Sequence, residues 1–241
     1  MKLLCDLGNS RLKWAYGDGA LSGFGWGAYG GEEDFALKLA LVPRPKAIAA
    51  ISVASRHSAR FQGFCETHWQ VVPTWYRACR EGFGVRSLYE PPDALGVDRF
   101  AALVGARTRF GARALCVVDC GTAITVDAID NEGIFQGGAI FPGMATAAAA
   151  LAGAAERLTT VDFAGEISAV GRGTVGAVKG GILLGTAGAI DRLLDEQKAM
   201  LRTAVLVVLT GGDAHGLAPY LRHPHEIAPH LTLEGLAVMA A

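Results

Sequence analysis

Residues 3–13 read LLCDLGNSRLK, and residues 116–126 read CVVDCGTAITV. In both stretches a short apolar run ends at Asp-x-Gly followed by a polar residue, and a second strand-like run begins at once. Asp6 and Asp119 lie about half the chain apart, so the pattern predicts two homologous halves, each opening with the same strand-turn-strand unit. Asp-x-Gly is also ordinary turn chemistry after a strand, which leaves coincidence open at this point.

Composition favours a folded protein with a large core. The chain has 241 residues, of which 51% are hydrophobic and 19% charged, enough apolar area to offset the entropy of ordering. The net charge is −1, from 22 basic and 23 acidic residues. This balance gives no basic surface for nucleic acid or for an anionic membrane, and we expect neither as a partner.

The five cysteines include no CxxC pair and are odd in number, which favours a reduced, cytoplasmic location. No uninterrupted apolar stretch reaches the roughly 18 residues of a membrane span. The N-terminus also lacks the pattern of a secretory signal.

Strand-like and helix-like patterns alternate along the rest of the chain. We predict strands over residues 47–53, 116–119, 123–127, 134–140 and 204–209, and helices over 94–110, 144–158, 174–201 and 232–240. This order predicts an α/β fold with two halves, residues 1–110 and 111–241, joined compactly near residues 108–113.

The hairpin of residues 6–13 is the strongest candidate for a phosphate site. Gly8 and Asn9 tolerate the positive φ of a tight turn, so we expect backbone N–H groups to face outward as a nest for anionic oxygens. Lys13 can reach back over the turn, and Asp6 can hold Mg²⁺ through water, since hard cations prefer oxygen ligands. A surface hairpin with a solvated lysine is the alternative.

Period two on the returning strand places Leu12, Trp14 and Tyr16 on one face and Arg11 and Lys13 on the other. The second hairpin offers another carboxylate, Asp119, and the hydroxyl of Thr122. Two such turns, one from each half, predict a clamp on the β- and γ-phosphates.

The sequence Gly96-Val97-Asp98-Arg99 offers a carboxylate beside a cation. Asp98 could cap a helix, a role that aspartate fills well. It could instead accept the proton of a substrate hydroxyl, with Arg99 binding an anionic group of the same substrate. Gly96 would then let the substrate approach the backbone.

The stretch Thr210-Gly211-Gly212-Asp213 follows an apolar strand, and its glycines would let a flat ligand such as adenine lie against the backbone; an ordinary turn is the alternative. Four histidines follow, and the pair His223-x-His225 suggests zinc. Because no cysteine cluster or third ligand stands at the usual spacing, we interpret them as surface residues. The four are His215, His223, His225 and His230.

Together these motifs resemble type III pantothenate kinase, over residues 6–213 and in the order of that family. The motifs are Asp6-x-Gly8-Asn9-Ser10-x-x-Lys13, Gly96-x-Asp98-Arg99, Asp119-x-Gly121-Thr122-Ala123-x-Thr125-x-Asp127, Gly137-Gly138-x-Ile140-x-Pro142-Gly143 and Thr210-Gly211-Gly212-Asp213. Two details depart from the family pattern: Ser10 stands where Thr is frequent, and residues 152–161 lack the usual Thr-Ala-x-Leu-Pro.

The resemblance implies the acetate and sugar kinase/Hsp70/actin superfamily, with duplicated RNase H-like (actin-like ATPase) domains and ATP in the interdomain cleft. It implies ATP-dependent phosphorylation of pantothenate to 4′-phosphopantothenate, the first step of coenzyme A synthesis. It also implies a homodimer that requires Mg²⁺ and a monovalent cation, K⁺ or NH₄⁺.

The resemblance assigns roles by position. Asp98 is the proton acceptor, and Asp119 is the ligand of the monovalent cation. The ATP-binding residues are Asp6, Leu7, Gly8, Asn9, Ser10, Arg11, Leu12, Lys13 and Thr122. The pantothenate-binding residues are Tyr89, Gly96, Val97, Asp98, Arg99 and Thr174, the last reaching the substrate near the subunit interface.

Two rival functions stay open. A kinase or polyphosphate phosphatase of the same fold would act on another substrate. An ATP-binding accessory or regulatory factor would bind nucleotide without turnover; the Asp98–Arg99 pair argues against it, because a switch needs no substrate base.

Overall fold

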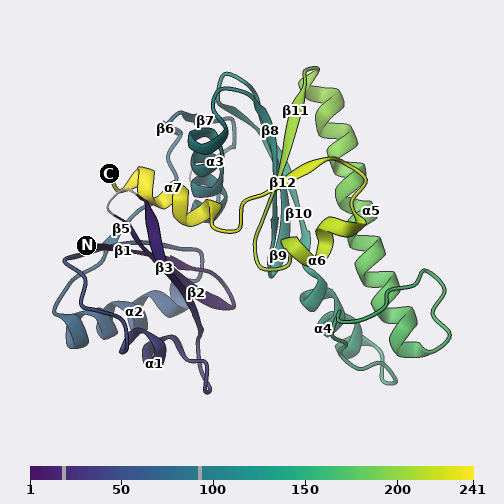
Figure 1. The fold of residues 1–241 in the computed structure, drawn as a ribbon, viewed down its shortest axis with the longest axis horizontal. Helices are drawn as coiled ribbons and strands as arrows, with labels where there is room; N and C mark the ends of the chain where they lie inside the picture. Colours follow the sequence, from purple (N-terminus) through teal and green to yellow (C-terminus); the bar gives the residue numbers. More distant parts are fainter. Residues whose placement is uncertain (18–19, 92–93) are drawn as a thin grey trace. The chain divides into compact units, whose positions relative to one another are not determined.

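The computed structural model describes residues 1–17, 20–91 and 94–241, drawn in Figure 1. The chain forms two compact units. Unit 1 comprises Met1–Ala112, Gly133–Phe135 and His230–Ala241, and unit 2 comprises Arg113–Glu132 and Gln136–Pro229.

A five-stranded sheet in the order β3-β2-β1-β4-β5 forms the centre of unit 1. The first three strands pair antiparallel, and β4 and β5 continue the sheet in parallel. The strands are β1 (Lys2–Leu7), β2 (Arg11–Gly17), β3 (Leu21–Ala28), β4 (Ala47–Ser52) and β5 (Thr74–Trp75). The other elements of the unit are α1 (Phe35–Leu39), α2 (Ser55–Phe64), a π-helix (Cys65–Trp69), β6 (Glu81–Gly82), β7 (Val85–Ser87), α3 (Val97–Phe110) and α7 (Leu231–Met239).

The predicted faces of the returning strand β2 are confirmed. Leu12, Trp14 and Tyr16 are buried and pack in one cluster with apolar side chains of β1, α1 and α2. Arg11 is exposed and Lys13 is half-buried. Alternation along the strand therefore separates the core from a charged face.

The terminal helix α7 belongs to unit 1 because it packs closely against α3. A Cβ on Gly235 would lie 1.8 Å from the carbonyl oxygen of Ala101, and one on Gly105 would lie 2.3 Å from that of Leu231. Only glycine allows the two backbones this approach. The predicted halves, residues 1–110 and 111–241, concern duplication in the sequence and stay a prediction.

Unit 2 is built on a mixed sheet in the order β12-β11-β8-β9-β10. Its strands are β8 (Ala114–Cys120), β9 (Ala123–Ile129), β10 (Ile134–Pro142), β11 (Val205–Thr210) and β12 (His225–Ile227). The first two residues of β10 belong to unit 1, where they pair with β7, which in turn pairs with β6. The helices are α4 (Met144–Ala154), α5 (Thr174–Leu201), α6 (Ala214–Leu217) and a 3-10 turn (Ala218–Tyr220).

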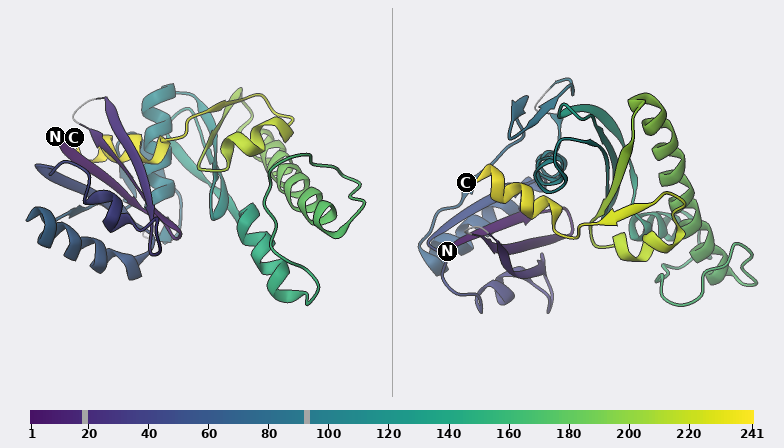
Figure 2. Two further views of the ribbon diagram at one scale, coloured as in Figure 1. Left: turned by 60° about the horizontal axis from the view of Figure 1, so that its bottom comes forward. Right: turned by 45° about the horizontal axis from the view of Figure 1, so that its top comes forward.

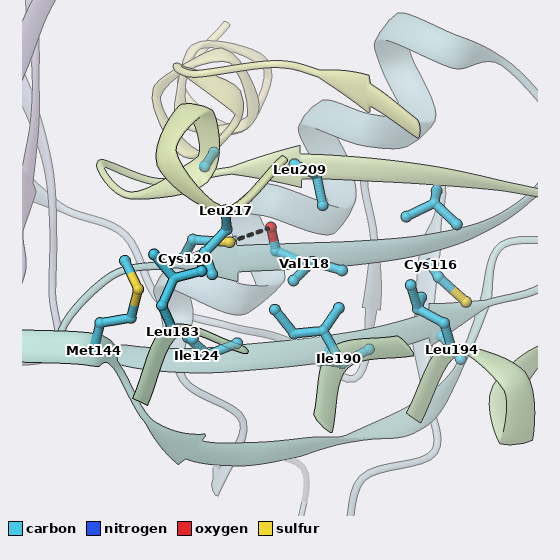
Figure 3. Packing of buried hydrophobic residues seen from close by; sticks show 14 residues of the cluster. Cys116, Val118, Cys120, Ile124, Met144, Leu183, Ile190, Leu194, Leu209 and Leu217 are labelled. Atoms are coloured by element: carbon cyan, nitrogen blue, oxygen red, sulfur yellow. Dashed lines mark hydrogen bonds between the residues drawn. The ribbon is translucent and has the colours of Figure 1, made fainter. Parts of the chain in front are cut away.

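The long helix α5 runs along one face of the unit 2 sheet (Figure 2). Figure 3 shows how Leu183, Ile190 and Leu194 of this helix pack against Cys116 and Cys120 of β8. All of these side chains are at most 2% exposed. Burial of such side chains is worth about 1.5–3 kcal/mol each before entropic costs, so this layer holds α5 to the sheet.

Most predicted elements are present. The helix predicted over residues 174–201 has those bounds, whereas the one predicted over 144–158 ends at Ala154 because Ala155 is extended. Sequence patterns missed β3, α1, α2 and the short strands β5–β7 and β12. In the described parts of the chain, no helix combines the length and apolar character needed to cross a membrane.

The two hairpins are alike in their turns. Asp6 lies opposite Lys13 in the first, and Asp119 lies opposite Thr125 in the second. In each, the turn glycine donates its N–H to the carbonyl of the first residue of the returning strand, at 3.1 Å. The first turn is longer by one residue, so Lys13 corresponds structurally to Thr125, not to Val126 as the sequence alignment suggests.

We expect Gly235→Ala to destabilise the protein by about 1–3 kcal/mol, because the added methyl overpacks against the backbone of α3. Gly63→Ala in α2 is the matched control, since its Cβ would meet nothing within 4 Å; it should stabilise by about 0.5–1 kcal/mol. Denaturant unfolding of both variants measures this. Equal stability of the two would refute the close helix contact.

Candidate functional site

The turn between β1 and β2 carries the first group of predicted site residues. Neither Gly8 nor Asn9 has a positive φ, so that expectation was wrong. A close approach favours glycine here: a Cβ on Gly8 would lie 3.3 Å from the carbonyl oxygen of Arg11, which is a tight contact. The Gly8 N–H is used within the turn, where it donates to the carbonyl oxygen of Arg11.

Asp98 does not cap its helix. The N-cap position of α3 is Gly96, which makes no side-chain cap bond, and Asp98 is the second helical residue. Its Oδ1 accepts a hydrogen bond from the N–H of Arg99 at 2.7 Å. A Cβ on Gly96 would lie 2.7 Å from this oxygen. Glycine at position 96 therefore leaves space for the carboxylate. Its backbone conformation is one that other residues can also adopt.

The environment of Asp98 makes its carboxylate a stronger base than usual. Burial raises the pKa of Asp98, and this outweighs the hydrogen bond from Arg99 N–H and the charges of Arg99 and Lys13, which lower it. The charge of Lys13 is the smallest of these influences. A raised pKa is what proton acceptance requires.

Arg99 and Tyr89 meet beside this carboxylate. The guanidinium of Arg99 donates to Tyr89 Oη at 3.4 Å and lies 5.3 Å from the centroid of the Tyr89 ring and 5.6 Å from that of Phe135. The two rings are stacked, with centroids 5.9 Å apart. Arg99 is 6% exposed, so its cation is held in one place. Val97 is buried as well, and the neighbouring Pro92 and Asp93 lie outside the described residues.

Three of the sequence motifs meet at the turn of the second hairpin in unit 2. Gly211 has a φ of +90°, and its Cβ would lie 2.4 Å from both Asp119 Oδ1 and the carbonyl oxygen of Cys120. Gly143 approaches from α4, where its Cβ would lie 2.0 Å from the carbonyl oxygen of Gly121. Close backbone packing therefore explains why glycines stand in these motifs.

The carbonyl of Thr122 accepts hydrogen bonds from Gly143 N at 3.0 Å and from Thr146 Oγ1 at 2.6 Å. Thr122 itself is exposed, and so is Thr174, the first residue of α5. A Cβ on Gly212 would meet nothing within 4 Å. Of the two glycines predicted to admit a flat ligand, Gly211 is thus structural and Gly212 is open.

Within the described residues, no group of three or more His, Cys, Asp or Glu side chains is arranged to hold a metal ion. His223 lies 3.0 Å from Asp195 and 3.0 Å from Lys198, so it is a half-buried member of an ion cluster rather than a surface residue. His215 and His230 are exposed. All five cysteines are free thiols.

Sequence analysis missed two residues of the site. Phe135 stacks on Tyr89, and Thr146 holds the second turn. Both contacts join segments far apart in the chain, and no local pattern indicates them.

We expect Asp98→Asn to raise the unfolding temperature at pH 7, because it removes a half-buried charge whose desolvation raises the pKa of the carboxyl. The pKa of Asp98 is higher folded than unfolded, so wild-type stability falls as pH rises from the unfolded to the folded value. The gain should shrink toward the usual carboxyl range near pH 4. Thermal unfolding between pH 4 and 8 tests this; a gain independent of pH would contradict the burial argument.

Comparisons with known proteins place the chain beside one family. A family model described as type III pantothenate kinase matches residues 2–196. A type III pantothenate kinase of Nitrosococcus oceani is 33% identical over 249 residues, covering 100% of this chain and 94% of that protein. One from Halorhodospira halophila is 38% identical over 250 residues, covering 98% and 96%.

Solved structures agree on the fold. A Campylobacter jejuni protein described as a Baf family transcriptional activator superposes with a TM-score of 0.64 at 23% identity, covering 99% of this chain and 97% of its own. The activator of a 2-hydroxyisocaproyl-CoA dehydratase from Clostridium difficile, solved with ADPNP, gives 0.55 at 11%, covering 99% and 93%. At these identities the likeness shows the shared actin-like ATPase and sugar kinase fold alone.

Proposed function

The chain belongs to the type III pantothenate kinase family, and on that premise we propose that it phosphorylates pantothenate with ATP. The product is 4′-phosphopantothenate, and the reaction opens coenzyme A synthesis. The observation in the structure that carries the proposal is Asp98, a half-buried carboxylate whose Oδ1 accepts the N–H of Arg99 at 2.7 Å, next to the guanidinium of the same residue, which is 6% exposed.

The reaction we propose is an in-line displacement. The acceptor hydroxyl oxygen bonds to the γ-phosphorus while the bond from that phosphorus to the β–γ bridging oxygen breaks, releasing ADP. Asp98 takes the proton of the hydroxyl. Because the transition state of phosphoryl transfer is loose, positioning and charge neutralisation contribute more than covalent chemistry.

Residues 6–13 are the proposed phosphate site. Lys13 supplies a positive charge, and the turn supplies N–H groups. Asp6 is 5% exposed and lies opposite Lys13; it would hold Mg²⁺ through water, and the ion would neutralise phosphate charge. Thr122 of unit 2 as a further ATP ligand stays a prediction.

A monovalent cation is proposed at Asp119. Its carboxylate lies within a turn whose backbone is packed tightly by Gly211 and Gly143, and carboxylate and carbonyl oxygens are the donors that hard cations prefer. When bound, K⁺ or NH₄⁺ would add fixed positive charge at this turn.

Arg99 is proposed to bind the carboxylate of pantothenate. It is held by Tyr89 and Phe135, and a pre-placed guanidinium recognises a carboxylate well. Tyr89, Gly96 and Val97 would line the same site. A further prediction is that Thr174 contacts the substrate in a homodimer. The molecular mass measured by light scattering would test whether the protein is a dimer.

The alternatives fit less well. A regulator without turnover would gain nothing from a buried base that costs stability. A kinase for another small hydroxy acid would keep Asp98, so the acceptor has to be identified by assay. The free cysteines support the proposed reducing, cytoplasmic location.

We expect Asp98→Asn to lower kcat about 10²–10⁴-fold, the usual loss on removing a positioned base, while ADP binding is retained. Coupled detection of ADP release, with and without pantothenate, measures the rate. Glu81→Gln, an exposed carboxyl-to-amide change in unit 1, should behave as wild type. Full activity of Asp98→Asn would exclude the base, and ADP release indifferent to pantothenate would exclude the substrate.

Replacing K⁺ by Na⁺ should lower the rate of the wild type strongly. We expect the oxygen ligands at Asp119 to be spaced for K⁺, so the smaller Na⁺ would be held less well. Asp119→Asn should be slow in both salts, since it lacks the charge that holds the cation. Steady-state rates in matched chloride salts measure both effects. A wild type that is indifferent to the exchange would remove the cation role of Asp119.

A further inference from the structure

The carbonyl groups of the phosphate turn are held from outside the hairpin. Tyr29, just after β3, donates its hydroxyl hydrogen to the carbonyl oxygen of Gly8 at 2.9 Å. Arg56, in the first turn of α2, donates from Nη2 to the carbonyl oxygen of Asn9 at 3.4 Å. Two successive peptide groups are therefore each tied to a side chain from a different element.

These two donors are braced against each other through His57. The imidazole of His57 stacks on the Tyr29 ring, with centroids 3.5 Å apart and planes 5° apart. Arg56 Nε donates to His57 Nε2 at 3.0 Å. Arg60 donates to the carbonyl oxygen of Tyr29 at 3.3 Å. The cluster Tyr29–Arg56–His57 is thus a single packed group beside the turn.

The protonation states suit these roles. Burial, and then the carboxylate of Asp6, raise the pKa of Tyr29 well above its usual value, so its hydroxyl keeps its hydrogen. Burial, and then the charges of Arg56 and Arg60, lower the pKa of His57. A neutral His57 can accept the hydrogen bond from Arg56, which a protonated ring could not.

The geometry of the peptide bond gives the contacts a consequence. In a trans peptide, the C=O of one residue and the N–H of the next point in opposite directions. Glu90–Pro91 is the only cis bond in the described part of the chain. Since the carbonyls of Gly8 and Asn9 point to Tyr29 and Arg56, the N–H groups of Asn9 and Ser10 point the other way. Successive N–H groups directed to one side make an anion-binding concavity.

The turn of the second hairpin also has a carbonyl group that accepts hydrogen bonds from outside the hairpin. The carbonyl of Thr122 is held from outside by Gly143 N and Thr146 Oγ1. Unit 2 thus fixes the peptide plane of its turn with one backbone N–H and one side-chain hydroxyl from the start of α4, whereas unit 1 uses two side chains. The recurrence indicates that orientation of the turn peptides matters in both units.

We propose that Tyr29 and Arg56 are positioning residues, which orient the peptide groups of the phosphate turn so that their N–H groups face the nucleotide phosphates. This inference rests on the proposed ATP role of residues 6–13. Neither side chain has to contact the nucleotide itself.

The test is nucleotide affinity in Tyr29→Phe and Arg56→Ala. Loss of one hydrogen bond should weaken ADP binding about two- to tenfold in each variant, with the KM for ATP rising by the same factor. Adenosine affinity, kcat and the KM for pantothenate should stay within about twofold, because only the phosphate site is disturbed. Calorimetric titration with ADP and adenosine, in Mg²⁺, measures this, and Arg56→Lys should recover part of the loss.

Two control variants match these changes. Tyr16→Phe also removes a tyrosine hydroxyl that donates to a backbone carbonyl in unit 1, that of Pro43, away from the turn. Arg44→Ala removes an exposed arginine of unit 1. Both should bind ADP as the wild type does.

Lys13→Ala separates this inference from the function on which it rests. If Lys13→Ala loses ADP affinity while Tyr29→Phe and Arg56→Ala keep it, the positioning role is refuted and the proposed function stands. If adenosine and ADP weaken equally in the variants, the effect is a general structural one, which also refutes the role. If Lys13→Ala binds ADP normally, the phosphate site itself is misplaced and both proposals fall.

Discussion

The half-buried carboxylate of Asp98, whose pKa is raised, is the feature on which the candidate site in unit 1 depends. Asp98 lies at the start of α3, where desolvation raises the pKa of its carboxyl. The N–H of Arg99 and the charges of Arg99 and Lys13 lower this pKa, but by less. Position 96 is a glycine because the carboxylate of Asp98 occupies the space that a Cβ at this position would take. A stability cost at this position is the physical counterpart of catalytic use.

Close backbone approach is the second recurring constraint, and it explains the glycines better than turn conformation does. Gly211 and Gly143 stand where another chain segment leaves no room for a Cβ, and a Cβ on Gly8 would lie tightly against the carbonyl oxygen of Arg11 in its own turn. Of these three, Gly211 alone combines the close approach with a positive φ. In both units the resulting contacts fix the hairpin turn that follows an Asp-x-Gly strand end, and a turn with fixed peptide planes is pre-organised for an anion.

Sequence reasoning reached the α/β character, both hairpins, α5 and the motif residues, because period two, period 3.6 and turn chemistry are local signals. It misjudged Gly8, because a glycine can serve either a positive φ or a close approach of another atom, and the sequence does not distinguish the two. It considered Asp98 as a cap, because capping and catalysis select the same residue type next to a helix start. Tyr29, Arg56 and Phe135 could not be found, because their partners come from other strands and helices.

We propose that this chain moves the γ-phosphoryl group of ATP to a hydroxyl of pantothenate, with Asp98 as the proton acceptor. Phosphorus NMR of the purified protein with ATP, Mg²⁺, K⁺ and pantothenate observes the product directly. The account predicts a phosphate monoester resonance that grows in step with ADP and is all but absent with Asp98→Asn. ADP formed with inorganic phosphate alone, or the same monoester at an undiminished rate with Asp98→Asn, would contradict it.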